Sequence, residues 1–133
     1  MDEVNVQVEV KANPTEDLDK VRQAVENIFG NLKLEEKPQH KGSLLVAQAK
    51  DTESLVKFGN LLRRERIRDA ARGILFQSLR GNTITFHLNK QVAYAGHISF
   101  CEPVAESPLG PIRVQIKCNN PTKLIDWLAP RTM

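Results

Sequence analysis

The apolar pattern of residues 53–80 changes phase partway along, and this break limits how the middle of the chain can fold. Asp51-Thr52-Glu53 opens a helical region whose first apolar stripe is Leu55, Phe58 and Leu62. On a wheel of 100° per residue, the next stripe is turned about 140° away from Leu62. That second stripe consists of Ile67, Ala70, Ala71 and Ile74. One straight helix cannot bury both stripes against the same sheet, so we expect two helices, or one sharply bent helix, with Arg63–Arg66 at the junction.

Elsewhere the apolar residues follow the periods of strands and of helices. Val4, Val6, Val8 and Val10 alternate with polar residues, which is typical of a half-buried strand. Further strands are expected at residues 32–34, 44–49, 84–88, 98–100 and 112–118, and further helices after Asp17 and after Asn120-Pro121. Residues 37–42 and 107–111 are expected to be turns, whereas residues 89–96 stay ambiguous. The sequence therefore predicts an α+β fold in a single domain, residues 1–133.

Several classes of protein are excluded or disfavoured by composition. No stretch approaches the roughly 18 consecutive apolar residues of a membrane span, and the acidic start Met1-Asp2-Glu3 is unlike a secretory signal. Cys118 follows the apolar phase of its strand, whereas Cys101 falls on the opposite face of its own strand. A disulfide between them is therefore not expected. These features predict a cytoplasmic protein without a membrane partner.

The basic charge is concentrated in the middle of the chain. Residues 1–56 have a balance of −4, residues 57–82 of +5 and residues 83–133 of +2. The excess consists mostly of arginine, whose planar guanidinium suits phosphate or carboxylate. The candidate contacts are Arg63, Arg64, Arg66, Arg68 and Arg72. They favour contact with RNA or another polyanion, but they also fit salt bridges at a surface or between subunits, or neutralisation by the acidic N-terminal part.

Candidate catalytic and metal-binding residues are sparse. His87 and Asn89 share the polar face of one expected strand, and His97 and Cys101 share that of the next. If the strands are neighbours, His87, His97 and Cys101 approach one another, yet no pair has the close spacing of a metal site. A Cys101–His97 nucleophile–base pair lacks a visible orienting group. No catalytic motif or cofactor fingerprint is present, so we expect neither enzyme activity, nor a cofactor, nor a metal.

Several blocks of the sequence together resemble the archaeal uncharacterised protein family numbered 0201. The blocks are Leu62-Arg63-Arg64, Ile67-Arg68-Asp69-Ala70-Ala71-Arg72, residues 81–91, residues 106–112 and Ile125-Asp126-Trp127-Leu128-Ala129-Pro130. The resemblance implies a fold similar to that of the ribosomal protein that binds 5S rRNA, an antiparallel-rich sheet with helices packed mainly on one face. His87 and His97 depart from it, because a tyrosine and an arginine are expected at those positions.

These observations lead to one principal hypothesis and one alternative. The chain is expected to be a non-catalytic protein that binds structured RNA or another polyanion through its arginine-rich helical segment. Lys90 and Gln91, at the tip of a strand, are expected to assist the arginines. The alternative is a homodimeric assembly module in which the same arginines form intersubunit salt bridges. Trp127 is expected to anchor the last helix in the core.

Overall fold

A single antiparallel sheet forms the base of the molecule in the computed structural model, which describes residues 4–50, 52–101 and 110–131. Within these residues the sheet has seven strands in the order β2-β3-β1-β7-β5-β4, and β6 also pairs with β5. The strands are β1 (Val4–Ala12), β2 (Glu35–Pro38), β3 (Ser43–Ala49), β4 (Leu79–Arg80), β5 (Thr83–Leu88), β6 (Phe100–Cys101) and β7 (Ile112–Cys118). The strand β7 therefore lies in the middle of the sheet, between β1 and β5, although it is the last of the described strands in chain order.

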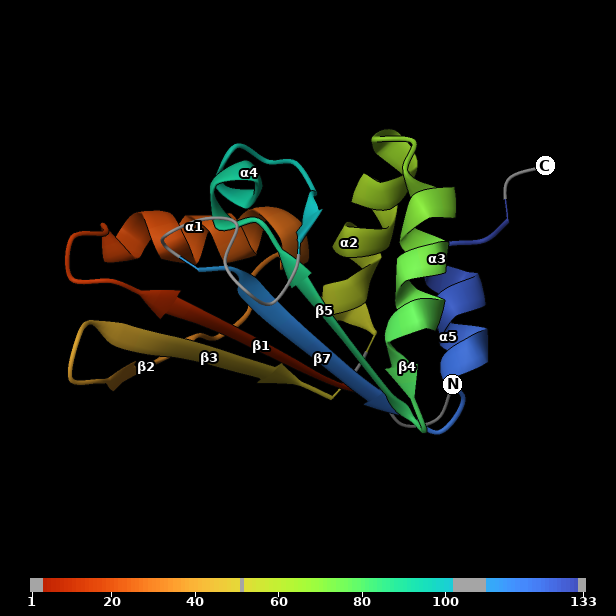
Figure 1. Ribbon diagram of the computed structural model, residues 1–133, viewed down its shortest axis with the longest axis horizontal. Coiled ribbons are helices and arrows are strands. Elements are labelled where there is room, and N and C mark those ends of the chain that lie inside the picture. The colour runs from red at the N-terminus through yellow and green to blue at the C-terminus, as the bar shows by residue number, and fades with distance from the viewer. Residues whose placement is uncertain (1–3, 51, 102–109, 132–133) are drawn as a thin grey trace.

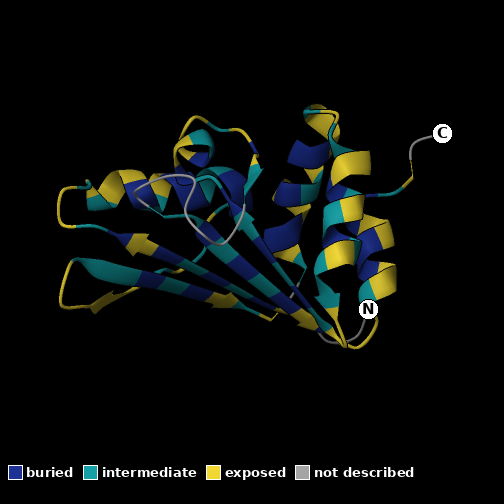
Figure 2. Cartoon of the chain, viewed as in Figure 1, coloured by how far each residue is buried: buried dark blue, intermediate teal, exposed yellow. Residues whose placement is uncertain are grey.

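Alternation along the strands leaves one face of the sheet buried and the other open. In β1, Val4, Val6, Val8 and Val10 are at most 3% exposed, while the residues between them are half-buried or exposed. The register carries this alternation across the sheet, because Val6 pairs with Ile116 of β7, which pairs with Ile84 of β5. The stripes of buried and less buried residues are visible in Figure 2. The period-2 prediction for β1 is confirmed.

Five helices among the described residues cover the buried face of the sheet (Figure 1). They are α1 (Leu18–Phe29), α2 (Glu53–Arg64), α3 (Arg68–Ser78), α4 (Lys90–Tyr94) and α5 (Pro121–Leu128). This arrangement confirms the expected α+β fold with an antiparallel sheet. No helix in the described ranges is long and apolar enough to cross a membrane.

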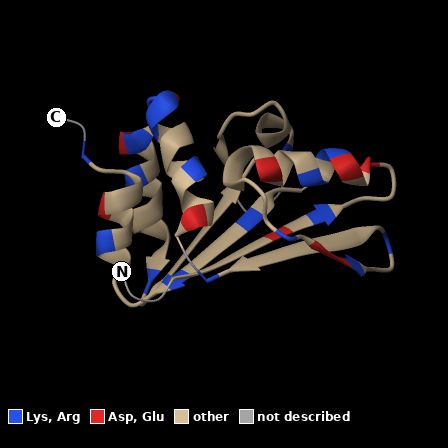
Figure 3. Cartoon of the chain, turned by 180° about the vertical axis from the view of Figure 1, so that it is seen from behind, with Lys and Arg blue, Asp and Glu red and all other residues tan. Residues whose placement is uncertain are grey.

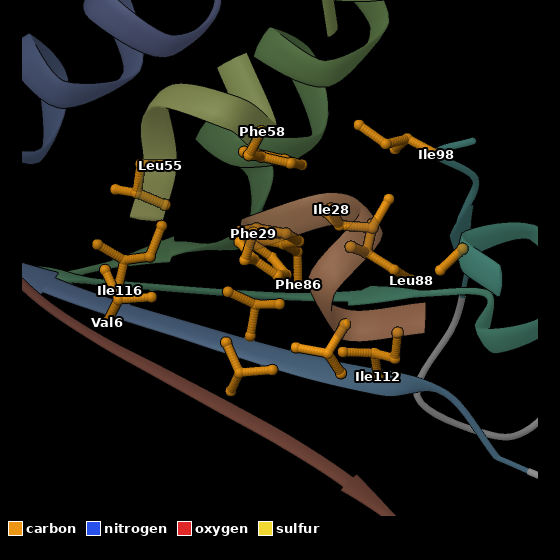
Figure 4. Packing of buried hydrophobic residues seen from close by; sticks show 14 of the residues in the cluster. Val6, Ile28, Phe29, Leu55, Phe58, Phe86, Leu88, Ile98, Ile112 and Ile116 are labelled. Carbon is orange, nitrogen blue, oxygen red and sulfur yellow. The ribbon is translucent and has the colours of Figure 1, made fainter. Parts of the chain in front are cut away.

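Stacked phenylalanines join α1, α2 and β5 in the core (Figure 4). The ring of Phe58, which is fully buried, stacks on Phe29 at 5.6 Å and on Phe86 at 5.4 Å between ring centroids. Phe100 meets Phe86 edge-on at 5.7 Å. Each fully buried ring contributes about 1.5–3 kcal/mol through burial, and each aromatic pair adds about 0.5–1.5 kcal/mol. The core therefore fixes α2 firmly over the sheet.

The break between α2 and α3 lies where the change of apolar phase predicts it. The helix α2 ends at Arg64 and α3 begins at Arg68, so two helices form. Between them Arg66 has a φ of 58°, a left-handed conformation that reverses the chain. The backbone N–H of Ile67 then donates to the carbonyl of Leu62 at 3.1 Å, which closes the junction.

Some local predictions need correction. The second strand is β2, at Glu35–Pro38, rather than residues 32–34. The turn expected at residues 37–42 is shorter, because Pro38 already pairs with Ser43. The strand expected at residues 98–100 is confined to Phe100–Cys101. Residues 89–96, which the sequence leaves ambiguous, form the short helix α4, and most of the turn expected at residues 107–111 lies outside the described residues.

Candidate nucleic-acid interface

The exposed end of the α2–α3 pair brings four arginines together. Arg63 and Arg64 occupy the last turn of α2, Arg66 the junction and Arg68 the first turn of α3. The side chains of Arg63, Arg64 and Arg66 are exposed, and Arg68 is half-buried. Figure 3 shows the resulting concentration of basic residues where the two helices meet. We call Arg63, Arg64, Arg66 and Arg68 the arginine tip.

The guanidinium groups of the arginine tip form no direct ion pair with a carboxylate among the described residues. Within the described part of the chain, no salt bridge shorter than 4 Å involves these four residues. The Nη2 atom of Arg63 lies 3.4 Å from the side-chain oxygen of Asn60, to which it donates. The acidic N-terminal part of the chain therefore does not cancel this basic region by direct pairing, at least through the residues that are described.

Glu65 lies between Arg64 and Arg66 in the sequence, but it bonds elsewhere. Its Oε2 accepts a hydrogen bond from Nδ1 of His97 at 2.6 Å, and its Oε1 accepts one from the backbone N–H of Ile98 at 2.9 Å. Burial opposes ionisation of Glu65, but the bonds from Ile98 and His97 and the charge of Arg64 outweigh it and hold its pKa below the ordinary value. Helical spacing would allow Glu65 to form a salt bridge with Arg68, but the two side chains do not form one.

Arg72 is directed into the protein rather than toward the arginine tip. Its Nη1 lies 2.7 Å from Oδ1 of Asp126 and donates to the carbonyl of Ala129 at 3.2 Å. Its guanidinium also lies 5.0 Å from the ring centroid of Phe76. These contacts join α3 to α5, so the expected phosphate contact from Arg72 is replaced by a structural role.

Lys90 and Gln91 lie away from the arginine tip, on α4. The Nζ atom of Lys90 donates to the carbonyl of Lys11 at 2.6 Å and to the carboxylate of Glu16 at 2.9 and 3.1 Å. Lys90 is only 3% exposed, so its charge does not reach solvent. Gln91 is exposed, but it lies beside α1, in a shallow groove that also includes Lys20. The structure therefore does not bring either residue to the arginines.

Of the three residues considered for metal binding, His87 and Cys101 come together, but His97 does not join them. His87 lies opposite Cys101 in the β5–β6 pair, whereas His97 bonds Glu65. Burial raises the pKa of the Cys118 thiol, and neither Cys101 nor Cys118 forms a disulfide. Among the described residues, no group of three or more His, Cys, Asp or Glu side chains is placed to hold a metal ion.

Trp127 was expected in the core, but it lies at the surface. Its exposed fraction is 42%, and the core positions of α5 are filled by Leu124, Ile125 and Leu128. The exposure of Trp127 can be predicted from a helical wheel, on which this residue falls about 100° from the centre of that apolar stripe. Trp127 instead lines a hollow of about 270 Å³ between α2, α3 and α5, together with Arg63 and Arg68.

The sequence of this chain is similar to those of known proteins of one family. A family model described as RNA binding matches residues 5–118. A UPF0201 protein of Sulfurisphaera tokodaii is 50% identical over 125 residues, which are 94% of this chain and 86% of the relative. One of Sulfolobus acidocaldarius is 46% identical over 125 residues, with the same shares covered. The chain therefore belongs to the UPF0201 family.

Solved structures agree with this membership. The UPF0201 protein from Methanococcus jannaschii has 34% sequence identity and a TM-score of 0.84, over 97% of this chain and 95% of that chain. Mth689 from Methanothermobacter thermautotrophicus, a DUF54 protein, has 18% identity and a TM-score of 0.68, over 96% of this chain and 99% of that chain. This second likeness shows a shared fold.

Proposed function

We propose that the protein is a non-catalytic RNA-binding protein whose arginine tip contacts the phosphates. The observation that carries the proposal is the exposure of Arg63, Arg64 and Arg66 beside Arg68, without an ion pair among the described residues. The matching family model, described as RNA binding, supports the same class of ligand. A cytosolic location forms part of the proposal, because Cys101 and Cys118 form no disulfide, as is usual in a reducing compartment.

Phosphate groups suit the chemistry of this surface. Each guanidinium presents several N–H donors in a plane and stays charged at any physiological pH. Four such groups within one helix–junction–helix segment match the repeating charge of a nucleic-acid backbone. Because an arginine side chain accepts no proton at neutral pH, the proposal assigns binding to these residues and no chemical step.

A salt titration tests the proposal directly. Fluorescence anisotropy of labelled mixed-sequence RNA is measured at several salt concentrations. If four phosphates are neutralised, log K falls against log salt with a slope of about −2.8 for a single strand. The Arg64→Ala/Arg66→Ala variant should reduce the slope by about 1.4.

Arg80→Ala provides the matched control. Arg80 is also exposed, but it lies on β4 and its Nη1 donates to the carbonyls of Gln77 and Leu79. This variant should leave the slope unchanged. If no RNA binds at low salt, the proposed RNA-binding function is refuted.

The alternative is self-association through the same arginines. It is favoured by the exposed acidic pair Glu35–Glu36 on the edge strand β2, which is a candidate surface for the arginine tip of a second copy. Light scattering distinguishes the two assignments. A homodimer held in this way should dissociate in the Arg64→Glu/Arg68→Glu variant, whereas a native protein with the mass of one chain rules the homodimer out.

A further inference from the structure

A hollow of about 270 Å³ opens between α2, α3 and α5, beside the arginine tip. Among the described residues, the large hydrophobic side chains that are exposed are Val56, Tyr94 and Trp127. Two of these, Val56 and Trp127, line this hollow. The hollow is completed by Leu55, Gly59, Asn60, Arg63, Arg68, Leu128 and Pro130. It therefore combines an exposed indole with two guanidinium groups and an amide.

The walls of the hollow are held in place by contacts below it. A Cβ atom at Gly59 would lie 3.6 Å from Cδ2 of Leu128, so α2 and α5 pack closely there. Arg72 fixes α5 to α3 through Asp126, the residue before Trp127, and through the carbonyl of Ala129, beyond the end of the helix. The backbone that carries Trp127 is thus fixed on both sides of the residue, which lowers the entropic cost of using its side chain for binding.

The combination of side chains selects a particular ligand. An exposed indole stacks favourably on the flat face of a nucleobase, whatever the base. Arg63 and Arg68 can then pair with the flanking phosphates, and Asn60 offers both a donor and an acceptor to a base edge. An uncharged apolar ligand would make no use of the two guanidinium groups. Bases inside a duplex are already stacked and do not present a free face to an indole.

We propose that this hollow binds an unpaired nucleobase of the RNA, stacked on Trp127, while Arg63 and Arg68 hold the adjacent phosphates. The inference rests on the proposed RNA-binding function and specifies it further. It assigns single-stranded or looped segments as the preferred ligand. It also divides the surface into a stacking position at Trp127 and purely electrostatic positions at Arg64 and Arg66.

Intrinsic fluorescence can read this site alone, because Trp127 is the only tryptophan of the chain. A short single-stranded RNA should quench and shift its emission as the complex forms. An oligomer with the same number of phosphates but without bases should bind more weakly and leave the emission nearly unchanged. If the RNA and the abasic oligomer change the emission equally, the stacking assignment is wrong.

Substitutions separate stacking from charge. Trp127→Ala should weaken binding of single-stranded RNA by about five- to 150-fold, the range for loss of one stacked base. The salt slope should stay the same, because no phosphate contact is removed. Trp127→Phe should recover most of the affinity. Tyr94→Ala is the matched control, since Tyr94 is an aromatic residue of similar exposure, 46%, but lies on α4 outside the hollow.

The outcomes distinguish this inference from the function on which it rests. Circular dichroism first verifies that each variant is folded. RNA binding by anisotropy with unchanged affinity in Trp127→Ala overturns the stacking site but leaves the arginine tip as the binding surface. Tighter binding of duplex than of single-stranded RNA also overturns the stacking site. If no RNA binds at low salt, the stacking site and the proposed function both fail.

Discussion

Removing the carboxylate of Glu16 should destabilise the protein strongly, because Glu16 neutralises a buried ammonium. The side chains of Lys90 and Glu16 are 4% and 11% exposed. In the Glu16→Ala variant, Nζ of Lys90 would keep only the carbonyl of Lys11 among the acceptors described above. Breaking a buried pair by removing one partner costs about 3–5 kcal/mol. That is a large part of the roughly 5–15 kcal/mol by which a domain of this kind is stable.

The opposite substitution should cost less. In Lys90→Met the long apolar stem is retained, and the remaining carboxylate still accepts hydrogen bonds from the backbone N–H and from Nδ2 of Asn13, both at 2.9 Å. We expect a loss of about 1–3 kcal/mol, the usual cost of a buried polar group that loses one partner. Because Lys90 does not reach solvent, Lys90→Met should leave the salt dependence of RNA binding unchanged.

Urea unfolding followed by circular dichroism measures both variants at neutral pH, with Lys123→Met as control. Lys123 is exposed on α5, so its substitution should change the free energy of unfolding by less than about 0.5 kcal/mol. The reasoning is refuted if Glu16→Ala stays within about 1 kcal/mol of the native protein, or if Lys90→Met costs more than Glu16→Ala.

The same pair should respond to acid. Burial opposes ionisation of Glu16, but hydrogen bonds from Asn13 and Lys90 and the charge of Lys90 outweigh it, so the pKa of Glu16 lies below its ordinary value. A lowered pKa in the folded protein stabilises it above the pKa of the unfolded chain, about 4.3, and this contribution is lost as the pH falls further. The stability difference between the native protein and Glu16→Ala should therefore shrink below about pH 4.

Three further substitutions probe α3 and its junction with α2. Gly73→Ala should raise the free energy of unfolding by about 0.5–1 kcal/mol in urea melts. The reason is that Gly73 is inside α3, with no atom within 4 Å of an added Cβ. A loss of stability in this variant would contradict the prediction. Arg66→Gly should keep stability within about 1 kcal/mol, since glycine adopts the φ of 58° freely, while anisotropy shows a salt slope smaller by about 0.7. Asp126→Asn should cost only about 0.2–1 kcal/mol in the same urea melts, because Asp126 is 55% exposed.

Local periodicity explains why much of the fold was predictable. The shift of phase after Leu62 is visible in the sequence, and it forces the chain to reverse near Arg66. The strand β2 left no such signal, because all four of its residues are exposed and only pairing with β3 defines it. A strand without a buried face has no apolar alternation to detect.

The candidate site was predicted less completely, for reasons that involve contacts distant in sequence. Arg63 and Arg64 were predicted as phosphate contacts from charge alone; both are exposed, and the contact itself stays a prediction. Lys90 was assigned to the same surface because it follows a strand, but its partner Glu16 lies 74 residues earlier in the chain. Trp127 was expected to anchor α5 in the core, although its helical position is off the apolar stripe.

The position of β7 in the sheet has a consequence for the synthesis of the protein. Chains are made from the N-terminus, and domains begin to fold as they emerge. The strands β2, β3 and β1 can pair with one another early, and so can β5 and β4. Each of these two groups keeps an unpaired edge until β7 inserts between β1 and β5. Open strand edges are templates for pairing with other chains. The nascent protein therefore remains prone to aggregation until β7 is made, and a chain truncated before residue 112 would have both edges unprotected.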